Sequence, residues 1–327
     1  MARSRRESDP TLDDFGVLKL PQEADEPILG PVVRSALLEW LTETWEAEKL
    51  SAVGLKPRRR AIFDGAPGVG KTTLAHHLAA RLGLPMLAVR PERLISRYVG
   101  QTAEQIGALF DLLAAGLDEG DYAGLPVVLF FDEFDALAAQ RRSVQQHADQ
   151  ERNAYTNVLL QRIEQHDGLV IAATNFGDRI DQAIWRRFDI HVTLDLPGQR
   201  ERELIVERYL KPFGLPAHAL TMLAEALELA SPALIRSFCE NVKRQIVLSP
   251  ILNRPATREA VVGRVLASCQ PHPDLGKPRL WSHGEADKAV ALMPWPLPLA
   301  VDLPKVEAAP VPAASPANVV HFGGRRE

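Results

Sequence analysis

The stretch FDGAPGVGKTTLAHHLA, residues 63–79, constrains the fold of this chain more than any other segment. Gly65, Gly70, Lys71 and Thr72 match the spacing G-x-x-x-x-G-K-[ST]. The apolar run 61–63 precedes the loop, and leucines at helical spacing follow it. A strand, a glycine-rich loop and a helix in this order form a phosphate-binding loop, because backbone N–H groups and the helix N-terminus surround an anion.

The residue types in this loop predict how a nucleotide is held. Glycine permits positive φ angles and lets the phosphates approach the backbone. Lys71 is predicted to reach the β- and γ-phosphates, and the Thr72 hydroxyl to ligate Mg²⁺. The predicted nucleotide-binding residues are Gly65, Ala66, Pro67, Gly68, Val69, Gly70, Lys71, Thr72, Thr73 and Asp132.

Two further apolar runs end in polar side chains that suit ATP hydrolysis. VVLFFDEFDAL, residues 127–137, ends its apolar part at Asp132, which is placed to hold Mg²⁺ through water, and Glu133, a natural general base for an attacking water. GLVIAATN, residues 168–175, ends at Asn175, which suits a hydrogen bond to the γ-phosphate or the attacking water. The adjacent Asp-Glu pair favours hydrolysis by water over transfer to another acceptor.

Bulk properties exclude several classes of protein. The 327 residues are 46% hydrophobic, enough for one large or two modest domains, and the net charge of -4 is unlike that of a basic nucleic-acid binder. Cys239 and Cys269 lie in apolar helical patterns, which predicts buried thiols in a reducing compartment. We expect a cytoplasmic protein without a membrane partner, because no secretion signal or membrane-length apolar run is present.

The order of apolar patterns predicts four segments. Residues 1–26 are polar and are expected to form a flexible N-terminal arm. Strands expected at 61–63, 85–89, 127–132, 169–173 and 191–194 alternate with helices, so 27–197 is predicted to be an α/β nucleotide-binding domain. Four helices without a strand follow in 198–269. Residues 270–327 are rich in proline and alanine and are expected to be a largely disordered tail.

These motifs together resemble those of the AAA family of ATPases, a branch of the larger AAA+ group of P-loop ATPases. The resemblance covers residues 28–268 and depends on GAPGVGKTT, LFFDEFDAL, IAATN and the region 178–189. It implies a P-loop AAA+ α/β core with a parallel five-stranded sheet sandwiched by helices, followed by a small all-helical lid domain. It also implies ATP and Mg²⁺ as the bound groups, in a compact, single-ring bacterial type of the family.

The resemblance also assigns a role to Arg186 and Arg187, which precede Phe188-Asp189. In such a protein they look like arginine fingers, inserted into the ATP site of a neighbouring subunit and typically worth about 10³–10⁵ in rate. That role implies a homo-oligomeric ring, expected to be a hexamer. Which of the two arginines acts is left open, and plain surface charge is the alternative.

The segment 94–110 resembles the first pore loop of this family and the helix after it, with Tyr98, Val99 and Gly100 as its aromatic, apolar and glycine positions. Aromatic rings around a pore grip an extended polypeptide without demanding a sequence. The expected function is therefore unfolding, threading or remodelling of a protein client, with a separately encoded protease as a further expected partner. The alternatives are an AAA+ switch acting on nucleic acid, against which the negative charge and the aromatic loop argue, and an assembly clamp.

The sequence departs from the family pattern in its predicted lid. Residues 231–245 lack the small-Gly-Ala-Asp cluster that often contacts adenine, with Pro232 and Leu234 in place of its Gly and Asp. Arg236 is open to two interpretations, a lid sensor for the phosphates or a solvated helix arginine. The adenine pocket is expected to begin near residues 28–30, and the tail to be either a tether or a docking motif.

Overall fold

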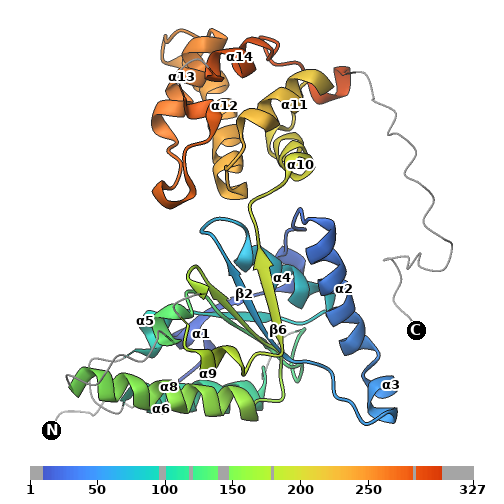
Figure 1. Cartoon of the computed structure of the whole chain (residues 1–327), viewed down its shortest axis with the longest axis vertical. Coiled ribbons are helices and arrows are strands. Elements are labelled where there is room, and N and C mark those ends of the chain that lie inside the picture. The colour runs from blue at the N-terminus through green and yellow to red at the C-terminus, as the bar shows by residue number, and fades with distance from the viewer. Residues whose placement is uncertain are drawn as a thin grey trace.

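The computed structural model describes residues 10–95, 101–117, 121–138, 147–177, 180–282 and 285–303. These residues form an α/β unit and a helical unit that begins after the last strand (Figure 1). The predicted pore-loop residues Tyr98, Val99 and Gly100 lie outside the described residues.

The α/β unit is built on one six-stranded sheet of order β1-β3-β4-β5-β2-β6. Its strands are β1 (Gly16–Lys19), β2 (Arg60–Gly65), β3 (Met86–Val89), β4 (Val128–Phe131), β5 (Val170–Thr174) and β6 (Ile190–Leu194). The five strands β2 to β6 are parallel, as predicted, but β1 pairs antiparallel to β3 at the sheet edge and makes the sheet mixed. The expectation of a five-stranded, wholly parallel sheet is therefore corrected by one strand.

The extra strand comes from the segment that was expected to be a flexible arm. Within residues 11–23 the chain forms α1 (Leu12–Phe15), β1 and the 3₁₀ helix η1 (Pro21–Glu23). Phe15 is buried at 4% exposure, and a Cβ on Gly16 would lie 2.3 Å from the Ala88 carbonyl oxygen. The polar composition of the segment did not predict this structure. The segment is ordered by one buried aromatic ring and by pairing with a strand that is distant in sequence.

Two apolar layers cover the sheet, because successive strand residues face opposite sides. On β2, Ile62 belongs to the layer under α6 and α8, whereas Phe63 belongs to the layer under α2 and α4 (Figure 1). The helices of this unit beyond α1 are α2 (Pro31–Trp45), α3 (Ala47–Ala52), α4 (Lys71–Arg81), α5 (Pro91–Leu94), α6 (Gln101–Ala115), α7 (Asp135–Ala138), α8 (His147–Gln165) and α9 (Gln182–Trp185).

The helical unit follows β6 and has its own core. Its longer helices are α10 (Gln199–Leu210), α11 (Ala217–Ala226), α12 (Pro232–Ile251) and α13 (Arg258–Ser268). The Ser231 hydroxyl caps α12 by accepting a hydrogen bond from the Leu234 N–H at 3.3 Å, and Pro232 occupies the first helical position. Phe238 and Cys239 of α12 are buried at the centre of this core, and Cys269 is buried beside it.

Part of the predicted disordered tail completes this core instead. Residues 273–302 contain η3 (Pro273–Leu275), η4 (Arg279–Trp281), α14 (Glu285–Ala291) and η5 (Ala300–Asp302). The Trp281 indole N–H donates to the Cys269 carbonyl at 2.6 Å, and Met293 and Leu297 are buried. The apolar side chains spaced among the prolines explain the order, because they pack into the same core as residues of α11, α12 and α13.

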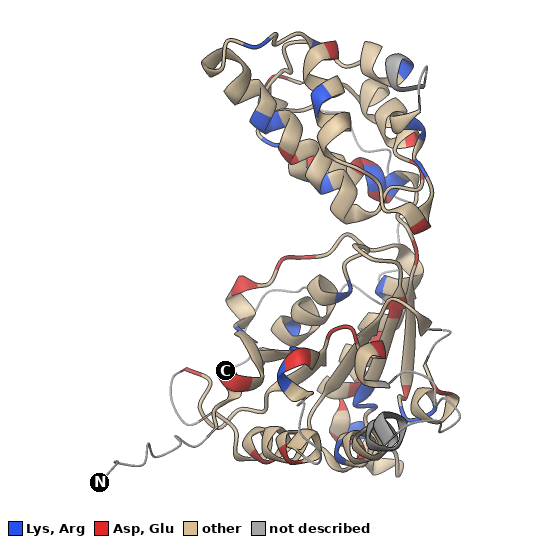
Figure 2. Ribbon diagram, turned by 90° about the vertical axis from the view of Figure 1, so that its left-hand side faces the viewer, with Lys and Arg blue, Asp and Glu red and all other residues tan. Residues whose placement is uncertain are grey.

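Basic and acidic residues are interspersed over both units (Figure 2). Among the helices of the described residues, none combines the length and the apolar character needed to span a bilayer.

Candidate nucleotide site

The phosphate-binding loop joins β2 to α4 and depends on glycine at two closely packed positions. Gly65 has φ of 153°, and a Cβ there would lie 2.4 Å from the Leu194 carbonyl oxygen. Gly68 has φ of 78°, and a Cβ there would lie 2.9 Å from the Ala233 side chain. At these two positions the loop therefore has no room for a side chain, and the positive φ angles also favour glycine.

Lys71 begins α4 and lies at the centre of the site, with only 7% of its surface exposed. Its ammonium donates to the Gly65 carbonyl at 2.5 Å, to the Ala66 carbonyl at 3.0 Å and to Asn175 Oδ1 at 2.7 Å. Burial lowers the pKa of Lys71, although the nearby carboxylates, led by Asp132, act in the opposite direction. The cation is thus held among neutral oxygens of the loop and the end of β5.

Two side-chain oxygens meet in the site, one from Thr72 of helix α4 and one from Asp132, directly after strand β4. The Thr72 hydroxyl donates to Asp132 Oδ2 at 2.9 Å. Glu133 follows with a φ of 48°, in the left-handed region that costs a non-glycine residue roughly 1–2 kcal/mol, and its side chain is exposed. This backbone turn separates the directions of Asp132 and Glu133, so the two carboxylates are available for different tasks.

A hydrogen-bond network at the end of β5 supports Asn175. The Thr174 hydroxyl donates to Asp135 Oδ1 and accepts from the Phe176 N–H, both at 3.0 Å. The Gly177 N–H donates to Asp64 Oδ1 at 3.1 Å. The network includes three residues without a recognisable sequence signal of their own, although each lies within one of the motifs: Asp64, Asp135 and Thr174.

The helical unit closes one side of the site through the first turn of α12. The Ala233 N–H donates to the Gly68 carbonyl at 3.1 Å. Arg236 lies over the Tyr209 ring, 5.3 Å from its centroid, and its guanidinium donates to Glu240 at 2.7 Å, which raises the Arg236 pKa. Tyr209 and Ala233 were not identified from sequence, because nothing local marks a residue that reaches the loop from another unit.

These residues surround one hollow of about 360 Å³ at the carboxyl ends of the strands. It is lined by Pro67, Gly68, Gly70, Lys71, Thr72, Thr73, Asp132, Glu133, Asn175, Tyr209, Pro232, Ala233 and Arg236. Of the predicted loop residues, Gly65, Ala66 and Val69 lie behind it, and Val69 is buried in the core. Ile28 packs against the core of the helical unit and Leu29 against the apolar layer under α2 and α4, and residues 28–30 do not line the hollow.

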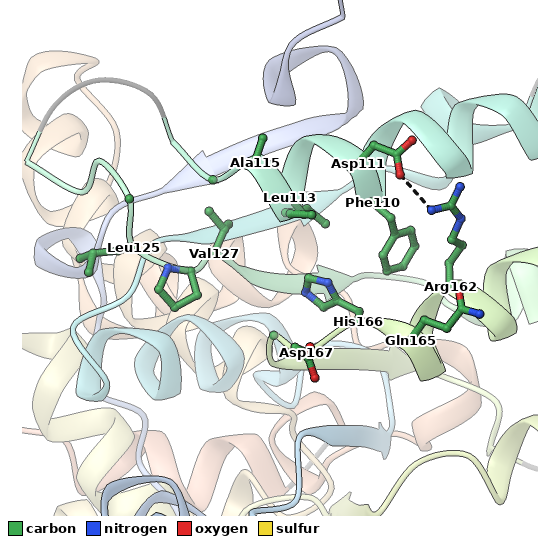
Figure 3. Close-up of a pocket in the computed structure, with 15 residues that line it drawn as sticks. Phe110, Asp111, Leu113, Ala115, Leu125, Val127, Arg162, Gln165, His166 and Asp167 are labelled. Atoms are coloured by element: carbon green, nitrogen blue, oxygen red, sulfur yellow. Dashed lines mark hydrogen bonds and ion pairs between the residues drawn. The ribbon is translucent and has the colours of Figure 1, made fainter.

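A second hollow, of about 500 Å³, lies at the opposite end of the strands between α6 and α8 (Figure 3). Phe110 and His166 form part of its wall with their rings in edge-to-face contact at 5.5 Å, and Arg162 pairs with Asp111 across its rim (Figure 3). The described residues that line it include no glycine-rich loop at a helix N-terminus, whereas the hollow around Lys71 has one.

Arg186 and Arg187 do not line the hollow around Lys71. They follow α9, whose start is capped by Asp181, and lead into β6. Arg187 forms an ion pair with Glu164 of α8, and Arg186 is exposed.

Comparison with known proteins agrees with this geometry. Residues 61–196 match the sequence model of the AAA family, described as "ATPase family associated with various cellular activities". The chain is 39% identical over 175 residues to an uncharacterized AAA family ATPase, y4kL, of Sinorhizobium fredii, an alignment that covers 54% of this chain and 49% of that protein.

Two relatives with more specific names also match part of this chain. An ATP-dependent zinc metalloprotease FtsH 1 of Symbiobacterium thermophilum is 33% identical over 180 residues, covering 53% of this chain and 29% of that protein. A proteasome-activating nucleotidase of Thermococcus onnurineus is 30% identical over 241 residues, covering 69% of this chain and 57% of that protein. The matched region is thus about half, or less, of the length of most such relatives.

The fold itself is similar to a solved structure. The crystal structure of the FIGL-1 AAA domain superposes with a TM-score of 0.61 at 19% identity, covering 84% of this chain and 90% of that chain. At that identity the similarity concerns the fold alone.

Proposed function

We propose that this chain, whose residues 61–196 match the sequence model of the AAA family, is an ATPase of that family and hydrolyses ATP to ADP and phosphate at the hollow around Lys71. The observation that carries the proposal is the convergence of Lys71, Asp132 and Asn175 from the carboxyl ends of three neighbouring parallel strands. Ligands bind at this edge in open parallel sheets.

Each side chain has a defined part in the proposed reaction. Lys71 exchanges its bond to Asn175 for the β- and γ-phosphates and neutralises their charge. Glu133 accepts a proton from the attacking water, which its exposed position at the rim of the hollow allows. Asn175, held by the network at the end of β5, orients that water or the γ-phosphate.

The hydroxyl and carboxylate oxygens at this site fit Mg²⁺, an ion that binds a few protein oxygens and keeps several of its waters. Thr72 and Asp132 would hold it, since their oxygens lie 2.9 Å apart in this structure. When bound, the ion supplies positive charge to the phosphates.

The test is a comparison of Glu133→Gln with Glu48→Gln, an exposed glutamate on α3 that serves as the matched control. We expect Glu133→Gln to lower phosphate release by about 10²–10⁴-fold while the affinity for a fluorescent ATP analogue stays near the wild-type value. Glu48→Gln should behave as wild type. Full turnover by Glu133→Gln would exclude the glutamate as the general base.

We further propose that the active unit is a homo-oligomeric ring, expected to be hexameric, in which Arg186 and Arg187 face the ATP of a neighbouring subunit. Their location outside the hollow of their own chain supports this. ATPase activity per subunit should rise with protein concentration, and Arg186→Ala/Arg187→Ala should bind ATP without turnover. Concentration-independent activity of a proven monomer would contradict the ring.

The proposed work of the ring is unfolding, threading or remodelling of a protein client. The relatives named as metalloproteases and proteasome-activating nucleotidases support a protein client and, as a further proposal, a separately encoded protease. Tyr98→Ala should keep basal ATPase activity and abolish the ATP-dependent unfolding of a test protein. Unchanged unfolding would remove the pore loop from the proposal.

A further inference from the structure

The two adjacent arginines at the end of α9 have unlike surroundings. Arg187 is half exposed, with 36% of its side chain accessible, and pairs with Glu164 of α8. Arg186 is exposed, and within the described part of the chain its guanidinium has neither a hydrogen bond nor an ion pair, although its backbone N–H donates to the Gln182 carbonyl at 3.1 Å. One guanidinium is therefore held by its own chain, and the other is free to meet another molecule.

Arg186 projects from a firmly anchored backbone. Ile184 and Phe188, on either side of the arginine pair, are buried at 2% and 3% exposure. The Phe188 ring contacts Phe134 edge to face at 5.6 Å, and Trp185 stacks on His191 at 4.6 Å. This packing holds the backbone on both sides of Arg186 in place, so its side chain extends from a fixed point on the surface.

Glu164 also stands on a fixed frame. Two residues before it, Arg162 pairs with Asp111 of α6 at 2.9 Å, and two residues after it, His166 packs against Phe110 (Figure 3). These two contacts hold the last turn of α8 against α6. Glu164, which lies between them in sequence, is therefore held in place to pair with Arg187.

We propose that Arg186 is the arginine that contacts the γ-phosphate of the neighbouring subunit, and that Glu164 is a positioning residue that holds Arg187. The proposal depends on the shared site proposed above. An arginine recognises phosphate with its planar fork of donors, and that fork is unoccupied on Arg186 and already engaged on Arg187. A carboxylate beside Arg187 also repels an incoming phosphate.

The experiment measures kcat and KM for ATP in Arg186→Ala, Arg187→Ala and Glu164→Gln, with ring assembly measured in parallel. We expect Arg186→Ala to lower kcat by about 10³-fold or more with little change in KM. Arg187→Ala and Glu164→Gln should each lower it only about 2- to 5-fold, in keeping with an exposed ion pair. The Arg187→Ala/Glu164→Gln double variant should be no worse than either single variant.

Conservative variants separate positioning from contact with the phosphate. Arg187→Lys keeps a cation for Glu164 and should restore most of the activity that Arg187→Ala loses. Arg186→Lys lacks the planar fork and should stay impaired. A loss for Arg187→Ala as large as that for Arg186→Ala, or additive effects of Glu164→Gln and Arg187→Ala, would overturn the assignment.

Mixing subunits distinguishes failure of this assignment from failure of the shared site. Lys71→Ala and Arg186→Ala are each expected to be inactive alone, and mixing them should restore activity, since Arg186 of one subunit then serves the intact phosphate site of the other. If Arg186→Ala is inactive but no mixture recovers, the shared site itself is wrong. If only mixtures of Lys71→Ala with Arg187→Ala recover, the site is shared but Arg187 is the acting residue.

Discussion

The contact between the phosphate-binding loop and α12 yields a sharp prediction at Gly68. A Cβ on Gly68 would lie 2.9 Å from the Ala233 side chain and 3.1 Å from the Ser231 hydroxyl oxygen, and the residue has φ of 78°. Gly68→Ala should cost roughly 1–2 kcal/mol for the left-handed backbone and about 1–3 kcal/mol for the overlap with α12. The free energy of unfolding should therefore fall by about 2–5 kcal/mol.

Gly70→Ala is the matched control for this prediction. Gly70 also has a positive φ, 103°, but a Cβ there would meet nothing within 4 Å. It should cost only the backbone part, about 1–2 kcal/mol. The difference between the two variants, measured by urea unfolding without nucleotide, isolates the contact between the loop and the helical unit.

A second substitution tests the identity of the clashing atom. Ala233→Gly removes the methyl group that the new Cβ would meet, at a helix-propensity cost of at most about 1 kcal/mol. The loss of unfolding free energy in Gly68→Ala/Ala233→Gly should therefore be smaller than the sum of the losses in the two single variants, by about 1 kcal/mol or more. Equal losses for Gly68→Ala and Gly70→Ala, with additive behaviour of the double variant, would refute the contact.

Three further outcomes are expected. Phe15→Ala should lower the free energy of unfolding by about 3–5 kcal/mol, because the ring is buried in the apolar layer under α6 and α8; a loss below about 1 kcal/mol in urea unfolding would return this segment to a flexible arm. A chain ending at Leu303 should keep the wild-type Tm, whereas one ending at Cys269 should melt at a lower temperature, because it lacks the buried Trp281 and Leu297; equal Tm values would mean that residues 270–303 do not pack. Burial raises the pKa of the Cys239 thiol to about 12, so above pH 9 the unfolded state loses this proton first and stability falls as pH rises. Relative to Cys239→Ala, wild-type unfolding free energy should drop by up to about 1.4 kcal/mol per pH unit between pH 9 and 12, and parallel curves would contradict the burial.

Most of the phosphate site was predictable because its chemistry is local in sequence. The loop from Gly65 to Thr73 carries its geometry in its own glycines, and Asp132, Glu133 and Asn175 each follow an apolar strand directly. The five parallel strands were predictable for the same reason, since each is a short apolar run between helical patterns. The roles of the individual site residues in turnover stay predictions.

The segments that sequence analysis misjudged depend on distant partners. β1 has only four residues, among them a glycine and a lysine, and its order comes from pairing with β3 and from the buried Phe15 ring. Residues 270–303 look disordered by composition, yet Trp281 and Leu297 fill a gap left by helices far upstream. Composition is an average over many residues, so it does not predict that a single large side chain is buried against distant helices.

The sequence by itself predicted a nucleotide-binding site and five parallel strands, because glycine spacing and apolar periodicity act within a few residues. Only the tertiary structure brought Thr72 to Asp132 across 60 residues and Lys71 to Asn175 across 104. It alone distinguished Arg186 from Arg187, which are identical in type and adjacent in sequence. The physical reason is that a side chain's charge partner is chosen by packing, and Glu164 is available to Arg187 only because α8 ends beside α9.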